Sequence, residues 1–112
     1  MHELSICEAI ADTVRQRSCG RIPTRVRVRI GYLRQVVPDS LLFSWEMVTT
    51  GSDLEGCVLD IDHVPAVVEC RACGERTTLG LPILACGSCD SLDVELVAGN
   101  ELDLASFDVT VS

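Results

Sequence analysis

Residues 68–94, VECRACGERTTLGLPILACGSCDSLDV, decide the fold of this chain. They contain two Cys-x-x-Cys pairs, Cys70 with Cys73 and Cys86 with Cys89, separated by a twelve-residue spacer. Two such pairs can bring four thiolates tetrahedrally around one zinc ion. All four positions are cysteine and none is left for water, so the spacing predicts a structural zinc rather than a catalytic one. A redox dithiol is the competing interpretation, although redox Cys-x-x-Cys motifs occur singly at a helix start.

The segment around these cysteines is too small to fold unaided. A lobe of about 30 residues buries too little apolar surface to be stable by itself, so metal binding has to supply the difference. We therefore expect a zinc-ribbon lobe at residues 66–97, with a short β-hairpin in the spacer.

Two amphipathic helices are predicted before this lobe. Apolar residues recur at helical spacing between residues 4 and 18, and again between residues 39 and 50 after a Pro-Asp-Ser start signal. Their expected inward residues are Leu4, Cys7, Ala11 and Val14 in the first helix, and Leu41, Leu42, Trp45 and Val48 in the second.

Three further segments alternate between apolar and polar residues, as half-buried strands do. They are TRVRVRIGY at 24–32, CVLDIDH at 57–63 and ELDLASFDVTV at 101–111. The predicted fold class is α+β: a small three-stranded sheet with two helices, made of residues 1–65 and 98–112, into which the zinc-ribbon lobe is inserted.

Charge and hydropathy narrow the choice of partners. The net charge is −8, with nine arginines and no lysine, which argues against nucleic acid because binding to phosphates depends on a positive surface. We expect the arginines of the first strand to pair with aspartates of its neighbours.

No apolar run approaches the roughly 18 residues of a membrane span, and no export signal is evident. These features predict a cytoplasmic protein.

The first residues offer a second kind of metal site. If the first helix begins at about Glu3 or Leu4, the amides of His2 and Glu3 have no acceptor within the helix. The Met1 amine, these amides and the His2 imidazole can then form fused chelate rings in one plane, which suits Ni(II) or Cu(II). From the residues alone, the alternative that His2 is simply an exposed side chain stays open.

Several motifs together resemble the HypA/HybF family of hydrogenase maturation nickel metallochaperones. They are MHE at the start, VxVxIG in the first strand, VxPxxLxFxW into the second helix, EGCxLxI in the next strand, the Cys-x-x-Cys pairs, and GNEL near the end. The resemblance covers essentially the whole chain, in order. Cys57 departs from it, because the family commonly has a small residue such as alanine there.

The resemblance implies a function as well as a fold. It implies that Met1, His2 and Glu3 bind Ni(II) as transient cargo, that the four cysteines hold structural Zn(II), and that Asp39 is a weaker candidate for supporting a nickel ligand. It further implies delivery to the [NiFe]-hydrogenase large subunit with help from the HypB GTPase, without catalysis by the chain itself. A monomer and a homodimer are both compatible with the sequence. The alternative function is a zinc-ribbon module that binds proteins or nucleic acid and has no nickel role.

Overall fold

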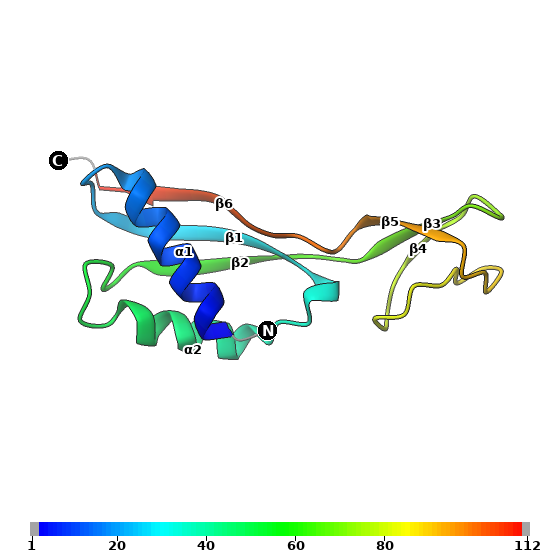
Figure 1. Ribbon diagram of the computed structural model, residues 1–112, viewed down its shortest axis with the longest axis horizontal. Coiled ribbons are helices and arrows are strands. Elements are labelled where there is room, and N and C mark those ends of the chain that lie inside the picture. The colour runs from blue at the N-terminus through cyan, green and yellow to red at the C-terminus, as the bar shows by residue number, and fades with distance from the viewer. Residues whose placement is uncertain (1–2, 111–112) are drawn as a thin grey trace. The chain divides into compact units, whose positions relative to one another are not determined.

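The computed structural model describes residues 3–110 of the chain. These residues form two α-helices, six strands and one short 3₁₀ helix between β1 and α2 (Figure 1). In chain order the elements are α1 (Glu3–Ser18), β1 (Pro23–Gly31), η1 (Tyr32–Arg34), α2 (Pro38–Thr49), β2 (Val58–Val64), β3 (Val67–Cys70), β4 (Arg76–Thr78), β5 (Val94–Ala98) and β6 (Leu102–Val109). Both predicted helices and all three predicted strands are present.

The described residues form two compact units. The helical unit contains residues 3–28, Val36–Asp62 and residues 103–110, and the cysteine unit contains Arg29–Gln35 and His63–Leu102. The architecture is the expected α+β fold with two helices, small sheets and a four-cysteine lobe. The domain boundaries expected from the sequence, at residues 65/66 and 97/98, stay a prediction.

The predicted three-stranded sheet has the strand order β2-β1-β6. Strands β1 and β6 run antiparallel, because the Gly31 N–H donates to the Glu101 carbonyl at one end and the Thr110 N–H donates to the Ile22 carbonyl at the other. Helices α1 and α2 pack on each other in the same unit. The buried core of this unit comes from the helices, from the inward face of the strands and from the segment between α2 and β2. Its residues are Ile6, Cys7, Ala11, Val14, Val26, Val28, Leu41, Trp45, Leu54, Cys57 and Leu59.

Two leucines expected in this core lie at the surface instead. Leu4 is 40% exposed and Leu42 is 43% exposed, whereas Ile6 is buried. On α2 the buried row is Leu41 and Trp45, which are one helical turn apart, and Thr49 continues it. Because successive helical residues are rotated by about 100°, Leu42 turns away from the core when Leu41 faces it.

The cysteine unit has a second sheet, with strand order β4-β3-β5. Strand β3 is antiparallel to both neighbours: Val68 faces Thr77 of β4 and Leu96 of β5. The prediction of a hairpin within the spacer is wrong. The spacer contributes only β4, which pairs back onto β3, so the first cysteine pair forms the turn of a β3–β4 hairpin.

Three chain segments of the cysteine unit meet at Gly31, Ala66 and Gly99. A Cβ atom on Gly31 would lie 2.1 Å from the Gly99 carbonyl carbon, and one on Gly99 would lie 2.3 Å from the Ala66 Cα. Gly99 also has a φ of +114°, in the region that favours glycine. Only glycine at positions 31 and 99 allows this close approach. The Leu33 N–H adds a contact at the same place by donating to the Gly99 carbonyl at 2.8 Å.

Within residues 3–110, no helix combines the length and the hydrophobicity that a membrane span requires.

Candidate functional site

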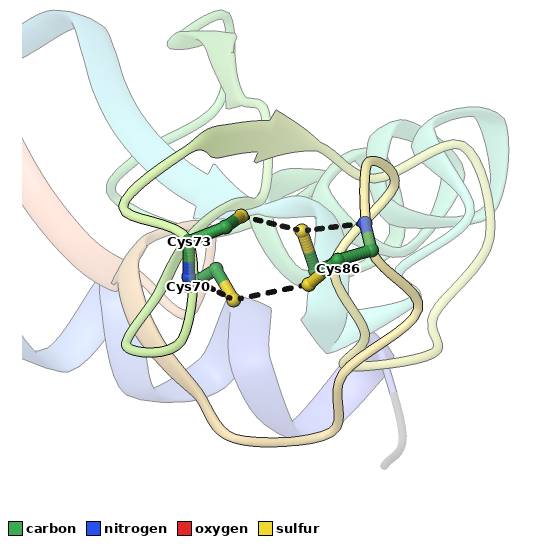
Figure 2. A group of neighbouring side chains, drawn as sticks. Cys70, Cys73 and Cys86 are labelled. Carbon is green, nitrogen blue, oxygen red and sulfur yellow. Dashed lines mark hydrogen bonds between the residues drawn. The ribbon is translucent and has the colours of Figure 1, made fainter.

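The four predicted cysteines converge in the cysteine unit. Their sulfurs all lie within 4.8 Å of one another, and they are the one group of three or more potential metal ligands that the described residues bring together. The Cys70 and Cys89 sulfurs are 3.6 Å apart, as are those of Cys73 and Cys86. Figure 2 shows Cys70 and Cys73 facing Cys86 across the site. Four sulfurs bound tetrahedrally at 2.3 Å from zinc would be about 3.8 Å apart, so the cluster has the dimensions of a zinc–thiolate cage.

Backbone amides orient the first sulfur of each pair. The Cys73 N–H points at the Cys70 sulfur, with an N–Sγ distance of 3.4 Å. The Ser88 and Cys89 N–H groups point at the Cys86 sulfur, at 3.3 and 3.4 Å. These partial positive charges stabilise thiolates. Cys70 and Cys86 are buried, whereas Cys73 and Cys89 are exposed, so each pair presents one sheltered and one accessible sulfur.

The residue after each pair closes the turn in the left-handed backbone region. The Gly74 N–H donates to the Cys70 carbonyl at 2.9 Å, and the Asp90 N–H donates to the Cys86 carbonyl at 3.1 Å. Gly74 has a φ of +79° and Asp90 a φ of +62°. Glycine adopts this conformation freely, and aspartate tolerates it better than most residues. Asp90 is not predicted from the sequence motifs, although its place directly after the second cysteine pair is a signal for this role.

The thiols of the cluster differ in acidity. The N–H groups of Cys89 and, to a smaller extent, Ser88 lower the pKa of Cys86 to about 6. A Glu75 backbone hydrogen bond acts to lower the pKa of Cys73, but desolvation and the adjacent Cys86 sulfur outweigh it and raise this pKa to about 12. The metal-free cluster therefore offers one ready thiolate at neutral pH and at least one thiol that must lose a proton to a metal.

The arginines nearest the cysteines in sequence are engaged in ion pairs. Arg71 Nη1 lies 3.0 Å from Asp93 Oδ1 and Arg76 Nη2 lies 3.5 Å from Glu69 Oε2.

The donor set of the cysteine cluster, four thiolates and no open position, fits a structural zinc ion and no catalytic one.

The predicted nickel residues fall mostly outside the described part of the chain. Met1 and His2 lie outside it. Glu3 is the first residue of α1, and Asp39 stands in the first turn of α2 with an exposed side chain. The structure therefore leaves the nickel ligand set a prediction.

Two arginines of β1, Arg25 and Arg27, pair with aspartates across the sheet as predicted. Arg25 forms an ion pair with Asp60 of β2. Arg27 binds both carboxylate oxygens of Asp108 on β6, at 3.2 and 2.9 Å. This double hydrogen bond lowers the pKa of Asp108. These two arginines are held by carboxylates of their own sheet, and they do not form a free cationic stripe.

A helix-and-sheet unit joined to a four-thiolate lobe defines a small metal-binding protein of α+β class with a zinc-ribbon site. The family model described as "Hydrogenase/urease nickel incorporation, metallochaperone, hypA" matches residues 1–109. The chain belongs to this HypA family of metallochaperones for nickel incorporation, as its sequence motifs indicated.

Relatives and solved structures agree with this assignment. The hydrogenase maturation factor HypA of Chlorobium limicola is 39% identical, covering 97% of each chain. The HypA of a Nostoc species is 34% identical, covering 97% of this chain and 96% of the other. The solution structure of the Ni metallochaperone HypA from Helicobacter pylori matches with a TM-score of 0.67 and 22% identity over the whole of both chains, which shows a common fold.

Proposed function

We propose that this chain binds Ni(II) at its N-terminus and delivers the ion to the large subunit of a [NiFe]-hydrogenase during maturation, with the help of a HypB GTPase. The proposed ligands are the Met1 amine, the His2 imidazole and backbone nitrogen, and the Glu3 backbone nitrogen. The observation that carries the proposal is membership of the HypA family over residues 1–109, a range that includes the Met-His-Glu start.

The start of α1 supports a role for the Glu3 amide. The helix begins at Glu3, and the first N–H groups of a helix have no acceptor within it. Such an amide can lose its proton to a metal without breaking a helical hydrogen bond. An amine, amides and an imidazole in one plane suit Ni(II), whereas the four thiolates of the cysteine unit suit tetrahedral zinc. The two sites therefore discriminate between the two ions by geometry and by ligand type.

Asp39 is the proposed support for a nickel ligand. The Cys7 thiol of α1 donates a hydrogen bond to the Leu41 carbonyl oxygen of α2 at 3.4 Å. This contact places the N-terminal half of α2, which includes Asp39, against the N-terminal half of α1, which begins at Glu3. A carboxylate in this position can accept a hydrogen bond from a nickel ligand and hold its orientation.

We propose that the four cysteines hold Zn(II) as a structural ion. When bound, zinc supplies a cross-link between the two cysteine pairs, in addition to the short sheet β4-β3-β5 and the Arg71–Asp93 ion pair that join their chain segments. The amides that face Cys70 and Cys86 favour the thiolate form that zinc binds.

We propose a carrier rather than an enzyme, acting in the cytoplasm. Burial raises the pKa of the Cys7 thiol to about 11 and also raises the pKa of Cys57, so both thiols are poor nucleophiles. All seven cysteines are free, as in proteins of a reducing compartment.

Calorimetric titration of Ni(II) into the zinc-loaded chain and into His2→Ala tests the nickel site. We expect the affinity of His2→Ala to fall by roughly tenfold or more. His63→Ala is the matched control, because His63 is the other histidine of the chain and is exposed at the end of β2. Equal nickel affinities for His2→Ala and the unmodified chain would contradict the assignment of His2 as a nickel ligand.

A second variant tests the amine without changing a side chain. Residues added ahead of Met1 turn its amine into an amide, and we expect weaker or rearranged nickel binding. The same residues added after Ser112 are the control. Unchanged nickel affinity and spectrum in the N-terminal extension would exclude the amine as a ligand.

The alternative function, a zinc-ribbon module that binds protein or nucleic acid without nickel, has less support. Arg25 and Arg27 already pair with Asp60 and Asp108, which leaves less positive charge for phosphates. Salt-dependent binding of RNA or DNA, together with absent nickel binding, would favour this alternative.

A further inference from the structure

Helix α2 has an outward face on which apolar and acidic side chains alternate. Leu42, Phe43 and Met47 are 43, 57 and 59% exposed. Asp39 and Glu46 are exposed beside them. We refer to these five residues as the acidic-apolar face.

Helical spacing gathers these residues on one side of α2. Asp39, Phe43 and Met47 follow each other at intervals of four, and so do Leu42 and Glu46, which places them in neighbouring rows. The opposite side of the helix is already complete, because Leu41 and Trp45 are buried there. The exposed apolar side chains of α2 therefore do not contribute to the core of the helical unit.

A single exposed apolar residue is ordinary, but this face has the composition of a binding surface. Aromatic residues and methionine are enriched at protein interfaces, and residues such as Phe43 serve as anchors in apolar pockets. A helix that presents Phe43 and Met47 one turn apart has the pattern by which helices lie in the apolar groove of another protein.

Charge identifies the kind of groove. Residues 38–49 contain two carboxylates, Asp39 and Glu46, and no arginine or lysine, so every charged side chain of α2 is negative. A partner that covers Phe43 and Met47 also approaches Asp39 and Glu46, and cationic side chains at its rim would give complementary charge.

The same charges speak against two other occupants. A second copy docking through this face would bring its own Asp39 and Glu46 against those of the first, and the chain carries a net charge of −8. An anionic membrane surface would repel the carboxylates in the same way.

The helix that carries this face packs with its N-terminal half on the N-terminal half of α1. Leu42 and Phe43 directly follow Leu41, whose carbonyl accepts the hydrogen bond of Cys7 in the N-terminal half of α1. A protein bound to α2 would thus approach the helix that begins at Glu3.

We propose that the acidic-apolar face of α2 docks the protein that receives nickel, through an apolar groove on that protein rimmed by arginine or lysine side chains. This inference rests on the proposed function, because it takes the nickel recipient as the partner.

The test measures binding of the full-length, zinc-loaded chain to purified [NiFe]-hydrogenase large-subunit precursor by biolayer interferometry. The variant Phe43→Ser/Met47→Ser removes the apolar anchors. The matched control is Ile22→Ser/Val58→Ser, since these two residues are 62 and 45% exposed in the same unit but do not belong to α2. We expect about a tenfold loss of affinity in the first variant and less than about a twofold change in the control.

A charge reversal tests the cationic rim separately. Glu46→Lys should weaken binding at ~0.05 M NaCl, and the difference from the unmodified chain should shrink at ~0.5 M NaCl as salt screens the pair. Glu46 is chosen over Asp39 because a change in the first turn would also disturb the helix dipole. Circular dichroism and zinc content confirm that each variant is folded.

Each outcome bears on the proposal. Unchanged affinity in Phe43→Ser/Met47→Ser, an equal loss in the control, or tighter binding by Glu46→Lys would overturn it. A concentration-dependent dimer that Phe43→Ser/Met47→Ser abolishes in analytical ultracentrifugation would assign the face to a second copy instead. Absence of binding between the precursor and the unmodified chain would also overturn the proposal.

Nickel titrations separate this inference from the proposed function. Phe43→Ser/Met47→Ser should bind Ni(II) like the unmodified chain. Normal nickel binding with unimpaired docking would reject the docking surface alone, whereas absent nickel binding in the unmodified chain would reject the proposed function itself.

Discussion

The Cys7 thiol donates a hydrogen bond to the Leu41 carbonyl oxygen, with an Sγ–O distance of 3.4 Å, in the interior of the helical unit. Both residues are fully buried. This contact fixes α1 against α2 at their N-terminal halves, which contain Glu3 and Asp39.

The burial of Cys7 predicts its resistance to alkylation. Desolvation, assisted by Glu3 and Glu8, raises its pKa to about 11, so at pH 8 the thiolate that reacts is scarce. In the native zinc-loaded chain, iodoacetamide should modify exposed Cys19 much faster than Cys7. Peptide mass spectrometry over time measures both rates, and equal rates at the two cysteines would contradict the burial. The Cys7 rate should increase as pH rises toward 11.

The left-handed turns after the cysteine pairs predict opposite effects of two substitutions. Gly74→Ala forces a Cβ into a backbone with φ of +79° and should cost about 1 kcal/mol, hence weaken apparent zinc affinity by about fivefold. Asp90→Gly, at a φ of +62°, should relieve strain and leave zinc affinity equal or higher. Competition with a chromogenic chelator measures both, and a weaker site in Asp90→Gly than in Gly74→Ala would refute this account.

Zinc binding should strengthen as pH rises. The amides of Cys89 and Ser88 keep the pKa of Cys86 at about 6, so above that pH this sulfur needs no deprotonation. The pKa of Cys73 is about 12, so its proton must be displaced at neutral pH. For each proton displaced, apparent affinity should rise about tenfold per pH unit. Below pH 6, Cys86 also takes up a proton and the dependence should steepen. Chelator competition across this range is the measurement, and a pH-independent affinity would contradict the assignment.

The close approach of Gly99 to Ala66 predicts a large loss of stability in Gly99→Ala. The added Cβ would meet backbone and side-chain atoms of Ala66 at a positive φ, which should cost more than about 3 kcal/mol. Gly80→Ala is the control, because no atom lies within 4 Å of its Cβ position. Thermal unfolding of the zinc-loaded variants compares them, and similar melting temperatures would show that the crossing tolerates a side chain.

The candidate metal site was predictable to a large extent because its signal is local. Cys70, Cys73, Cys86 and Cys89 are recognised by spacing alone, since two residues between thiols set the geometry of each pair. The helices and the long strands were equally readable from the period of their apolar residues. Strands β3 and β5 were missed, because their short apolar runs next to the cysteines have no clear period.

Which apolar residues are buried, and which chain segments meet, depended on tertiary contacts. The sequence placed Leu42 in the core, but α2 needs only one row against its unit, and the rotation of the helix leaves Leu42 exposed beside Phe43. The spacer was expected to pair with itself, but β4 pairs with β3, a strand that precedes the spacer in the chain.

By itself, the sequence determined the α+β class, the four zinc-type ligands and the Met-His-Glu start, because local periodicity and residue spacing encode these features. Only the tertiary structure decided that Cys7 meets Leu41, that Gly31 and Gly99 cross at Ala66, and that α2 presents an acidic-apolar face. These depend on contacts between residues far apart in the chain, which close packing selects and no local pattern records.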